Sequence, residues 1–207
     1  MWTTLAQIDI DLFFLINRSG ENGFFDVLMP AMSNLKNFYI PIGLAWLFLI
    51  VKPQAKFRIV AILILLLISF SEWTSSDVLK PAFQRPRPYH SLSNVHLYDR
   101  MAKTWSTTPK LDKIIRGESN SLPSSHATNI FAAAFFLSFY FRRMGLFFYL
   151  IAFLVGYSRV YLGVHFPLDV VAGVLVGSAC GLLFVWLGNA MILFFAKRNA
   201  PGPEISN

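Results

Sequence analysis

The feature that most constrains this chain is an apolar stretch at residues 167–196, in which Asp169 is the only charged side chain. A helix needs about 20 mainly apolar residues to cross the hydrocarbon core of a bilayer, so this stretch is long enough to span one. Four further apolar stretches, some of them shorter, lie at residues 38–51, 57–79, 126–141 and 144–157. The last two are separated only by Arg142 and Arg143, which predicts a tight helical hairpin.

The composition points to the same fold class. Of the 207 residues, 55% are hydrophobic and only 14% are charged, whereas a soluble domain carries about 25% charged residues. The 21 Phe, 5 Trp and 7 Tyr residues exclude a disordered chain, and the single cysteine excludes an intrachain disulfide. The sequence therefore predicts one all-α domain, residues 1–207, that forms an integral membrane bundle of five to six transmembrane helices.

The two ends of the chain differ from the bundle. Within residues 1–37, apolar side chains fall near helical spacing, but Asp9 and Asp11 interrupt them. This pattern favours amphipathic helices that lie at the membrane interface over a transmembrane span. Residues 199–207 are expected to form a flexible tail.

The net charge of +7 indicates an anionic partner. Because the chain is apolar and has no basic run or nucleic-acid motif, we expect anionic lipid or a phosphorylated substrate rather than a nucleic acid. Short connections rich in Lys and Arg mark the cytoplasmic side of a membrane. The basic residues of this kind are Lys52, Lys56, Arg58, Arg142, Arg143, Lys197 and Arg198. The opposite face is then predicted to be extracytoplasmic.

The longest connection, residues 89–121, is expected on that extracytoplasmic face. It carries five basic residues, which are Arg100, Lys103, Lys110, Lys113 and Arg116. Two interpretations stay open. The loop selects the headgroup of a lipid, or it is an ordinary surface loop without a role in recognition.

Gly173, Gly177 and Gly181 repeat every fourth residue and therefore lie on one face of the last helix. Such a face permits close contact with another helix. Packing inside the chain's own bundle is the favoured interpretation, and the seam of a homo-oligomer is the alternative.

Three polar clusters lie at the ends of apolar stretches on the predicted extracytoplasmic face. The first contains Lys80, Arg85 and Arg87, interspersed with three prolines. Because proline restricts the backbone, we expect an extended, rigid segment that suits a multiply charged anion. The alternative is a juxtamembrane patch that contacts lipid headgroups.

The second cluster, Pro123-Ser124-Ser125-His126, comes directly before an apolar helix. The first turn of a helix leaves backbone N–H groups free and carries partial positive charge, which favours an oxyanion. The alternative is an ordinary serine N-cap followed by an incidental histidine.

The third cluster contains Ser158, Arg159, His165 and Asp169. A helix that begins near residue 166 places Asp169 one turn beyond His165, so the carboxylate can reach the imidazole. A carboxylate on one ring nitrogen fixes the tautomer and leaves the other nitrogen available as a nucleophile or base. Together, histidines, cations and a helix start at the edge of an apolar bundle suit the transfer of a phosphoryl group.

The spacing of these clusters resembles that of the type 2 phosphatidic acid phosphatase (PAP2) family of membrane lipid phosphatases. Its motifs are Lys, six residues, Arg-Pro; then Pro-Ser-Gly-His; then Ser-Arg, five residues, His, three residues, Asp. The matching positions here are Lys80, Arg87, Pro88, Pro123, Ser124, His126, Ser158, Arg159, His165 and Asp169. The chain departs from the pattern at Ser125, where glycine is usual.

The resemblance implies a role for each of these residues. His165 would attack phosphorus and form a phosphohistidine, Asp169 would orient it, and His126 would protonate the leaving oxygen and then activate water. The phosphate-binding residues would be Lys80, Arg87, Ser124, Ser125 and Arg159. No metal or other cofactor is implied, and the sequence contains no ligand cluster at metal-binding spacing facing this site.

The resemblance thus implies a metal-independent phosphatase that removes a terminal phosphate from a lipid. It also implies a protein of the bacterial inner membrane that acts on the cell envelope, with its active site on the extracytoplasmic side. By family analogy the substrate is undecaprenyl pyrophosphate, phosphatidylglycerol phosphate, a lipid A phosphate or phosphatidic acid. Three alternatives are a phosphotransferase of the same family, a non-catalytic protein that binds anionic lipid, and a vanadium haloperoxidase. The high hydropathy of the chain argues against the last of these.

Overall fold

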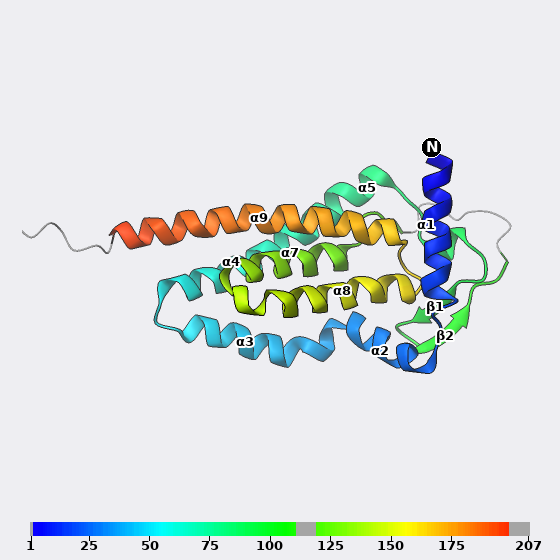
Figure 1. The fold of residues 1–207 in the computed structure, drawn as a ribbon, viewed down its shortest axis with the longest axis horizontal. Helices are drawn as coiled ribbons and strands as arrows, with labels where there is room; N and C mark the ends of the chain where they lie inside the picture. The colour runs from blue at the N-terminus through cyan, green and yellow to red at the C-terminus, as the bar shows by residue number, and fades with distance from the viewer. Residues whose placement is uncertain (1, 111–118, 199–207) are drawn as a thin grey trace, which may run out of the picture.

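Long helices packed side by side form the body of the protein (Figure 1). The computed structural model describes residues 2–110 and 119–198. The bundle consists of α2 (Gly23–Ser33), α3 (Tyr39–Val51), α4 (Ala55–Trp73), α7 (Ser125–Tyr140), α8 (Gly145–Tyr161) and α9 (Pro167–Arg198). The short 3-10 helix η1 (Leu35–Phe38) joins α2 to α3, and η3 (Arg142–Met144) forms the predicted tight connection between α7 and α8. The predicted helical stretches are therefore confirmed.

The helix α7 is the centre of the bundle, with α4, α8 and α9 packed around it. The core on its α4 and α9 side includes the fully buried side chains of Leu67, Ala132 and Phe136. Lipid tails are as apolar as these side chains, so close packing holds such helices together more than burial from water does.

The glycines of α9 make that close packing possible. A Cβ added at Gly173 would lie 2.8 Å from both the Ala127 Cβ and the Ser124 carbonyl oxygen, and one at Gly181 would lie 2.9 Å from the Phe135 Cβ. All of these neighbours lie on α7 or directly before it, as do those of Gly177. Packing within the bundle is therefore confirmed. The α7 helix occupies this face of α9, and the formation of a homo-oligomer stays a prediction.

Three helical segments among the described residues are long and apolar enough to cross a membrane, namely Ala55–Phe83, Arg142–Tyr161 and Pro167–Arg198. The helices Gly23–Ser33 and Leu35–Val51, which meet at a bend of 72°, would add a fourth if they form one broken span. The 16-residue helix α7 is shorter than these segments. The protein is an integral membrane protein, and the count of five to six crossings stays a prediction.

The helix α1 (Trp2–Asn17) runs across one end of the bundle rather than along it (Figure 1). Its Phe13 side chain is fully buried in a cluster with Val160 and Phe166. The buried Asn17 amide donates hydrogen bonds to the main-chain oxygens of His96 and Tyr161, at 2.7 and 2.8 Å. The helix is therefore fixed to the protein, and its place at a membrane interface stays a prediction.

The long connection contains a structure that the sequence did not reveal. After α6 (Pro88–Ser91), the strands β1 (His96–Asp99) and β2 (Thr104–Thr107) form an antiparallel hairpin. The His96 ring stacks on Trp105 with centroids 4.1 Å apart, and Trp105 in turn lies edge-on against Tyr161 of α8. The hairpin is thus docked on the end of the bundle. The predicted flexible tail at 199–207 and the loop residues 111–118 lie outside the described residues.

The sequence predicted an extended segment around the first basic cluster, but part of this segment is helical. The helix α4 continues through a π-helical turn, η2 (Thr74–Leu79), into the short helix α5 (Lys80–Phe83). Pro81 lies in the first turn of α5, directly after the π-helical turn. Gln84 then adopts a left-handed conformation, with φ 48°, and redirects the chain.

Candidate active site

The three predicted clusters meet at the end of the bundle that carries α1 and the hairpin. The Ser124 main-chain N–H donates to the Asp169 carbonyl oxygen at 3.0 Å, which joins the start of α7 to the start of α9. The Lys80 ammonium donates to the Ser125 hydroxyl at 2.7 Å, which joins α5 to the same place. Arg87 completes the set by donating to the Val164 carbonyl oxygen at 3.4 Å.

His165 and Asp169 form the buried centre of this site. Their side chains are 2% and 0% exposed, and the His165 Nδ1 lies 3.5 Å from the Asp169 Oδ2. The i,i+4 spacing follows from the start of α9 at Pro167, as the sequence indicated. The separation is longer than a well-formed hydrogen bond, as is common in catalytic sites without a bound substrate. With the Nδ1 facing the carboxylate, the Nε2 is the nitrogen available for chemistry.

The His165 imidazole is held in its neutral form. Removal from water lowers its pKa to about 4, and the charges of Arg159 and Arg87 act in the same direction. Asp169 opposes this effect by favouring the charged ring. A neutral imidazole beside a carboxylate is the state that a nucleophilic histidine requires at neutral pH.

Ser124 and Ser125 begin α7, but Ser124 does not cap the helix with its side chain. The Ser124 hydroxyl is buried without a hydrogen-bond partner among the described residues. The Ser125 hydroxyl accepts from Lys80 and also pairs with the Ser76 hydroxyl at 2.9 Å. The ordinary N-cap interpretation of this cluster is therefore not supported. The serines instead present hydroxyls and the start of a helix to one place.

Arg159 and Arg87 bring two guanidinium groups to the site. Arg159 is buried and donates to the Ser33 hydroxyl, and its main-chain oxygen accepts from the His165 N–H at 3.2 Å. The Nε atoms of both arginines are buried and have no hydrogen-bond partner among the described residues. Unpaired buried donors are rare and costly, so their gathering here indicates a place for an anion.

His126 follows the two serines in the first turn of α7. Its ring lies within electrostatic range of Arg159, His165 and Lys80, so it belongs to the same site. The structure thus brings together all the predicted site residues, which are Lys80, Arg87, Ser124, Ser125, His126, Arg159, His165 and Asp169.

The sequence did not predict the positions of two other arginines, Arg85 and Arg100. Arg85 was expected to hold an anion with its neighbours, but its guanidinium faces the far side of Asp169 and also binds Asp9 of α1. Arg100, from the turn of the hairpin, donates to the Ser33 carbonyl oxygen at 3.1 Å and so lies next to Arg159. Neither position carries a local signal, since each depends on contacts between residues far apart in the chain.

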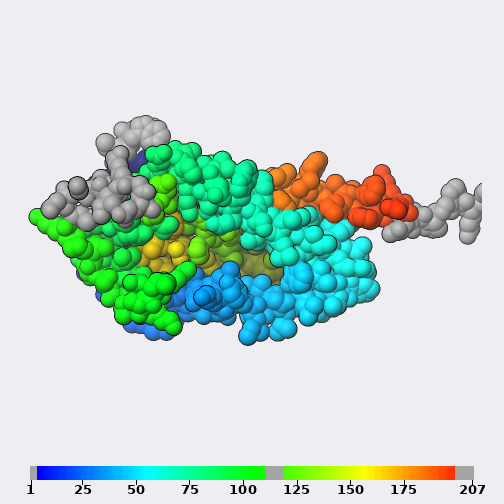
Figure 2. Space-filling view, turned by 180° about the vertical axis from the view of Figure 1, so that it is seen from behind, coloured from blue at the N-terminus to red at the C-terminus, as the bar shows by residue number. Residues whose placement is uncertain are grey.

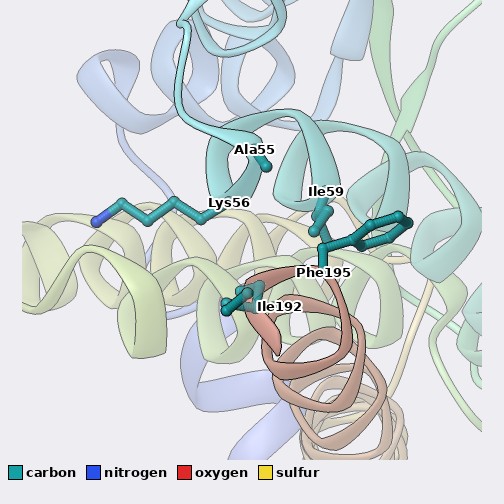
Figure 3. A pocket seen from close by; sticks show the side chains of 6 residues that line it. Ala55, Lys56, Ile59, Ile192 and Phe195 are labelled. Carbon is teal, nitrogen blue, oxygen red and sulfur yellow. The ribbon is translucent and has the colours of Figure 1, made fainter. Parts of the chain in front are cut away.

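Two cavities differ in the polarity and charge of their lining residues. One of about 150 Å³ lies between α4 and the end of α9, and apart from Lys56 its lining is apolar (Figure 3). Its lining residues are Ala55, Lys56, Ile59, Ile192, Phe195 and Ala196. A smaller one, of about 40 Å³, lies beside the site and is lined in part by Ser33, Arg100 and Lys103. The second cavity has two cations in its lining and lies next to Arg159, so it can face an anionic headgroup.

Cations, a helix start and two histidines gather at one end of this apolar helical bundle. This combination is typical of a membrane phosphatase. The comparison with known families gives the particular one. The model of the PAP2 superfamily matches residues 57–192, and this chain belongs to that family.

The similarities to individual proteins agree with this assignment. The chain is 31% identical to a lipid A 4'-phosphatase of Bacteroides thetaiotaomicron, over 90% of this chain and 80% of that protein. It is also 31% identical to an undecaprenyl-diphosphatase of Sulfolobus acidocaldarius, over 86% of this chain and 77% of the other. The crystal structure of LpxE from Aquifex aeolicus superimposes with a TM-score of 0.63 at 28% identity, covering 86% of this chain and 95% of that one.

Proposed function

We propose that this protein removes a terminal phosphate from a membrane lipid through a covalent phosphohistidine at His165. The observation that carries the proposal is the set of buried, unpaired donors on Arg87, Arg159 and Ser124 around a neutral histidine. Such donors are most useful where negative charge develops on phosphoryl oxygens. The relatives of this chain include phosphatases of lipid A and of undecaprenyl diphosphate, which supports a lipid phosphate as the substrate class.

In the first step, the His165 Nε2 attacks phosphorus and the bond to the leaving oxygen breaks. Asp169, which faces the Nδ1, stabilises the positive charge that develops on the imidazole. His126 donates a proton to the leaving oxygen. In the second step His126 takes a proton from water, which attacks the phosphohistidine and releases inorganic phosphate.

The nonbridging oxygens are held by Lys80, Arg87 and Arg159, with hydrogen bonds from Ser124 and Ser125. Ser125 fits this role although glycine is usual at its position, since its hydroxyl already lies 2.7 Å from the Lys80 Nζ. The Lys80–Ser125 pair is placed to hold one oxygen between them.

A lipid substrate needs a path for its tail from the membrane to the site. The space-filling view shows a hollow between the α4–α5 segment and α2, with residues of α8 at its floor (Figure 2). Exposed apolar side chains occur on both α4 and α2, among them Leu66, Trp73 and Val27. We infer that the tail lies along this side while the phosphate reaches His165.

The orientation follows from the basic residues at the other end. The α3–α4 connection, η3 and the end of α9 lie together at the end of the bundle opposite α1 (Figure 1). These segments carry Lys52, Arg142, Arg143 and Lys197. By the positive-inside rule that end is cytoplasmic, and the site then faces outward from a bacterial inner membrane.

The test is phosphate release by purified protein in detergent micelles from four lipids: undecaprenyl pyrophosphate, phosphatidylglycerol phosphate, a lipid A phosphate and phosphatidic acid. His165→Ala should abolish release, while Lys56→Ala, at the far cavity, should keep it. Acid-labile, base-stable radiolabel on the protein from a ³²P-labelled lipid would support the phosphohistidine.

Other results would assign a different function. Transfer of the label to an added alcohol rather than to water would indicate a phosphotransferase. Binding of all four lipids without turnover would indicate a non-catalytic protein.

A further inference from the structure

Arg85 connects the N-terminal helix to the site. Its Nη1 donates to the Asp169 Oδ1 at 2.8 Å and its Nη2 to the Asp9 Oδ2 at 2.5 Å. The guanidinium also lies over the Phe166 ring, 4.1 Å from its centroid. Both carboxylates are buried, at 1% exposure or less. One arginine thus holds two buried carboxylates, one of which belongs to the proposed catalytic pair.

Each oxygen of Asp169 has its own partner. The Oδ1 accepts from Arg85, and the Oδ2 accepts from the Phe166 main-chain N–H at 2.8 Å and faces His165. Arg85 therefore fixes the rotation of the carboxylate from the side away from the histidine. An equivalent partner behind a ligand or catalytic group usually sets its orientation.

Asp9 acts on the same place from α1. Its second oxygen, Oδ1, accepts from the Leu168 main-chain N–H at 2.8 Å, one of the first N–H groups of α9. The helix α1 does not need this contact for docking alone, because Phe13 is buried in an apolar cluster and the Asn17 amide makes its own hydrogen bonds. A buried carboxylate at residue 9 therefore calls for a separate reason.

The charges give that reason. Asp169 and Arg85 by themselves would form a neutral pair, and such a pair stabilises a positive imidazole poorly. With Asp9 included, the three groups carry a net charge of −1, and the negative charge of Asp169 remains available to His165. This balance matters because the other charged neighbours of His165, namely Arg159 and Arg87, are both positive. His126 and Lys80 lie in the same site.

We propose that Asp9 and Arg85 are positioning residues for the reaction at His165: Arg85 fixes the Asp169 carboxylate, and Asp9 cancels the charge of Arg85. This inference rests on the proposed function, since it concerns the same histidine. It assigns a role in the chemistry to the N-terminal helix, which lies outside residues 57–192.

The test compares the acid limb of kcat/KM among variants with altered charge. Asp9→Asn leaves the three groups neutral, which destabilises protonated His165 and should move the acid limb to lower pH. Arg85→Gln leaves a charge of −2 and should move it to higher pH. The double variant restores −1 and should return the limb toward that of the wild type. A nearby charge moves a pKa by about one unit at close range, so shifts of about half a unit are expected.

The rate constants should change as well. Both single variants should lose about tenfold or more in kcat, the usual cost of removing a partner behind a reacting group. Arg85→Lys should recover part of the loss, because it keeps the charge but not the two-carboxylate geometry. The matched control is Asp11→Asn, an acid-to-amide change on an exposed residue of the same helix, which should behave as wild type.

All variants are measured on the one lipid phosphate that the wild type hydrolyses fastest, so the ionisation of the substrate is common to them. If the wild type hydrolyses none, the proposed function fails. If it is active and Asp9→Asn keeps both kcat and the acid limb, the inference is overturned. It is also overturned if both single variants shift the limb in the same direction. Loss of folding in Asp9→Asn, seen by thermal melting with Asp11→Asn intact, would make the contact purely structural and overturn it too.

Discussion

The glycine face of α9 offers a sharp test of how the site is assembled. Gly173 lies one turn beyond Asp169 on α9, and its neighbours on the α7 side are Ala127 and the Ser124 carbonyl group. Ser124 begins the segment that carries Ser125 and His126, and Ala127 directly follows it. The change Gly173→Ala therefore adds a methyl group between the two halves of the site.

The size of the effect follows from the distances. The new Cβ would lie 2.8 Å from the Ala127 Cβ and from the Ser124 oxygen, and 3.1 Å from the Thr128 nitrogen. Carbon atoms pack at about 3.5–4.0 Å, so the two helix starts must separate by about 0.7–1.2 Å. Misplacement of catalytic groups by about 1 Å costs about 100-fold in rate. We therefore expect kcat/KM to fall about 10- to 100-fold, with a loss of about 1–3 kcal/mol in the free energy of unfolding from overpacking.

Two alanine variants separate geometry from stability. Gly181→Ala overpacks the same interface, with its Cβ 2.9 Å from the Phe135 Cβ, but about 18 Å along the helix from Asp169. It should lower the melting temperature while reducing kcat/KM much less than Gly173→Ala does. Gly43→Ala, whose Cβ would have nothing within 4 Å, should be neutral or stabilising by about 0.5–1 kcal/mol. Full activity in a well-folded Gly173→Ala enzyme would refute the reasoning.

Three further predictions concern the chemistry of the site. Because burial lowers the pKa of His165 to about 4, the acid limb of kcat/KM should lie near pH 4. The need for a protonated His126 should add a second limb, in which kcat/KM falls as pH rises. An acid limb near the ordinary histidine value of about 6.5, after correction for the ionisation of the substrate, would contradict a buried neutral nucleophile. Activity should survive a strong chelator but be inhibited by vanadate, which mimics five-coordinate phosphorus; loss with chelator and recovery with added metal would exclude this mechanism. Ser125→Ala removes the partner of Lys80 and a proposed donor to phosphate. KM should therefore rise about fivefold, the equivalent of about 1 kcal/mol, with a smaller change in kcat. An unchanged KM would show that Ser125 does not bind the phosphate.

The parts of this protein that the sequence predicted are those encoded locally. Apolar stretches placed five bundle helices within a few residues of their actual ends, because long apolar runs leave few other structures. These are α3, α4 with its continuation η2, α7, α8 and α9. The helix α2, which packs on α8, was not predicted as part of the bundle. The His165–Asp169 pair was predicted from its spacing on a helix that begins at Pro167. The convergence of three motifs came from a family pattern, since spacing along the chain does not place α5 next to α7.

The parts that were not predicted depend on long-range contacts. The Arg85–Asp9 ion pair joins residues 76 positions apart, and Arg85 looks like any other cation in a basic segment. The hairpin at residues 96–107 is short and largely polar, so alternation of apolar residues did not reveal it. Its place is set by Trp105 and His96 stacking together against Tyr161 of α8. Nothing near those residues in the sequence indicates such a contact.

The site contains arginines that pair with carboxylates and arginines that do not, and the distribution of charge explains why both occur. Among the described residues, Arg85 pairs with two carboxylates, whereas no ion pair compensates Arg87 or Arg159. An uncompensated cation at the end of an apolar bundle is costly unless it serves a function. A phosphate dianion would supply the missing charge, and Arg85, already neutralised by Asp9 and Asp169, would not compete for it. In the proposed mechanism, the same separation would keep Asp169 turned toward His165 instead of toward Arg87 and Arg159.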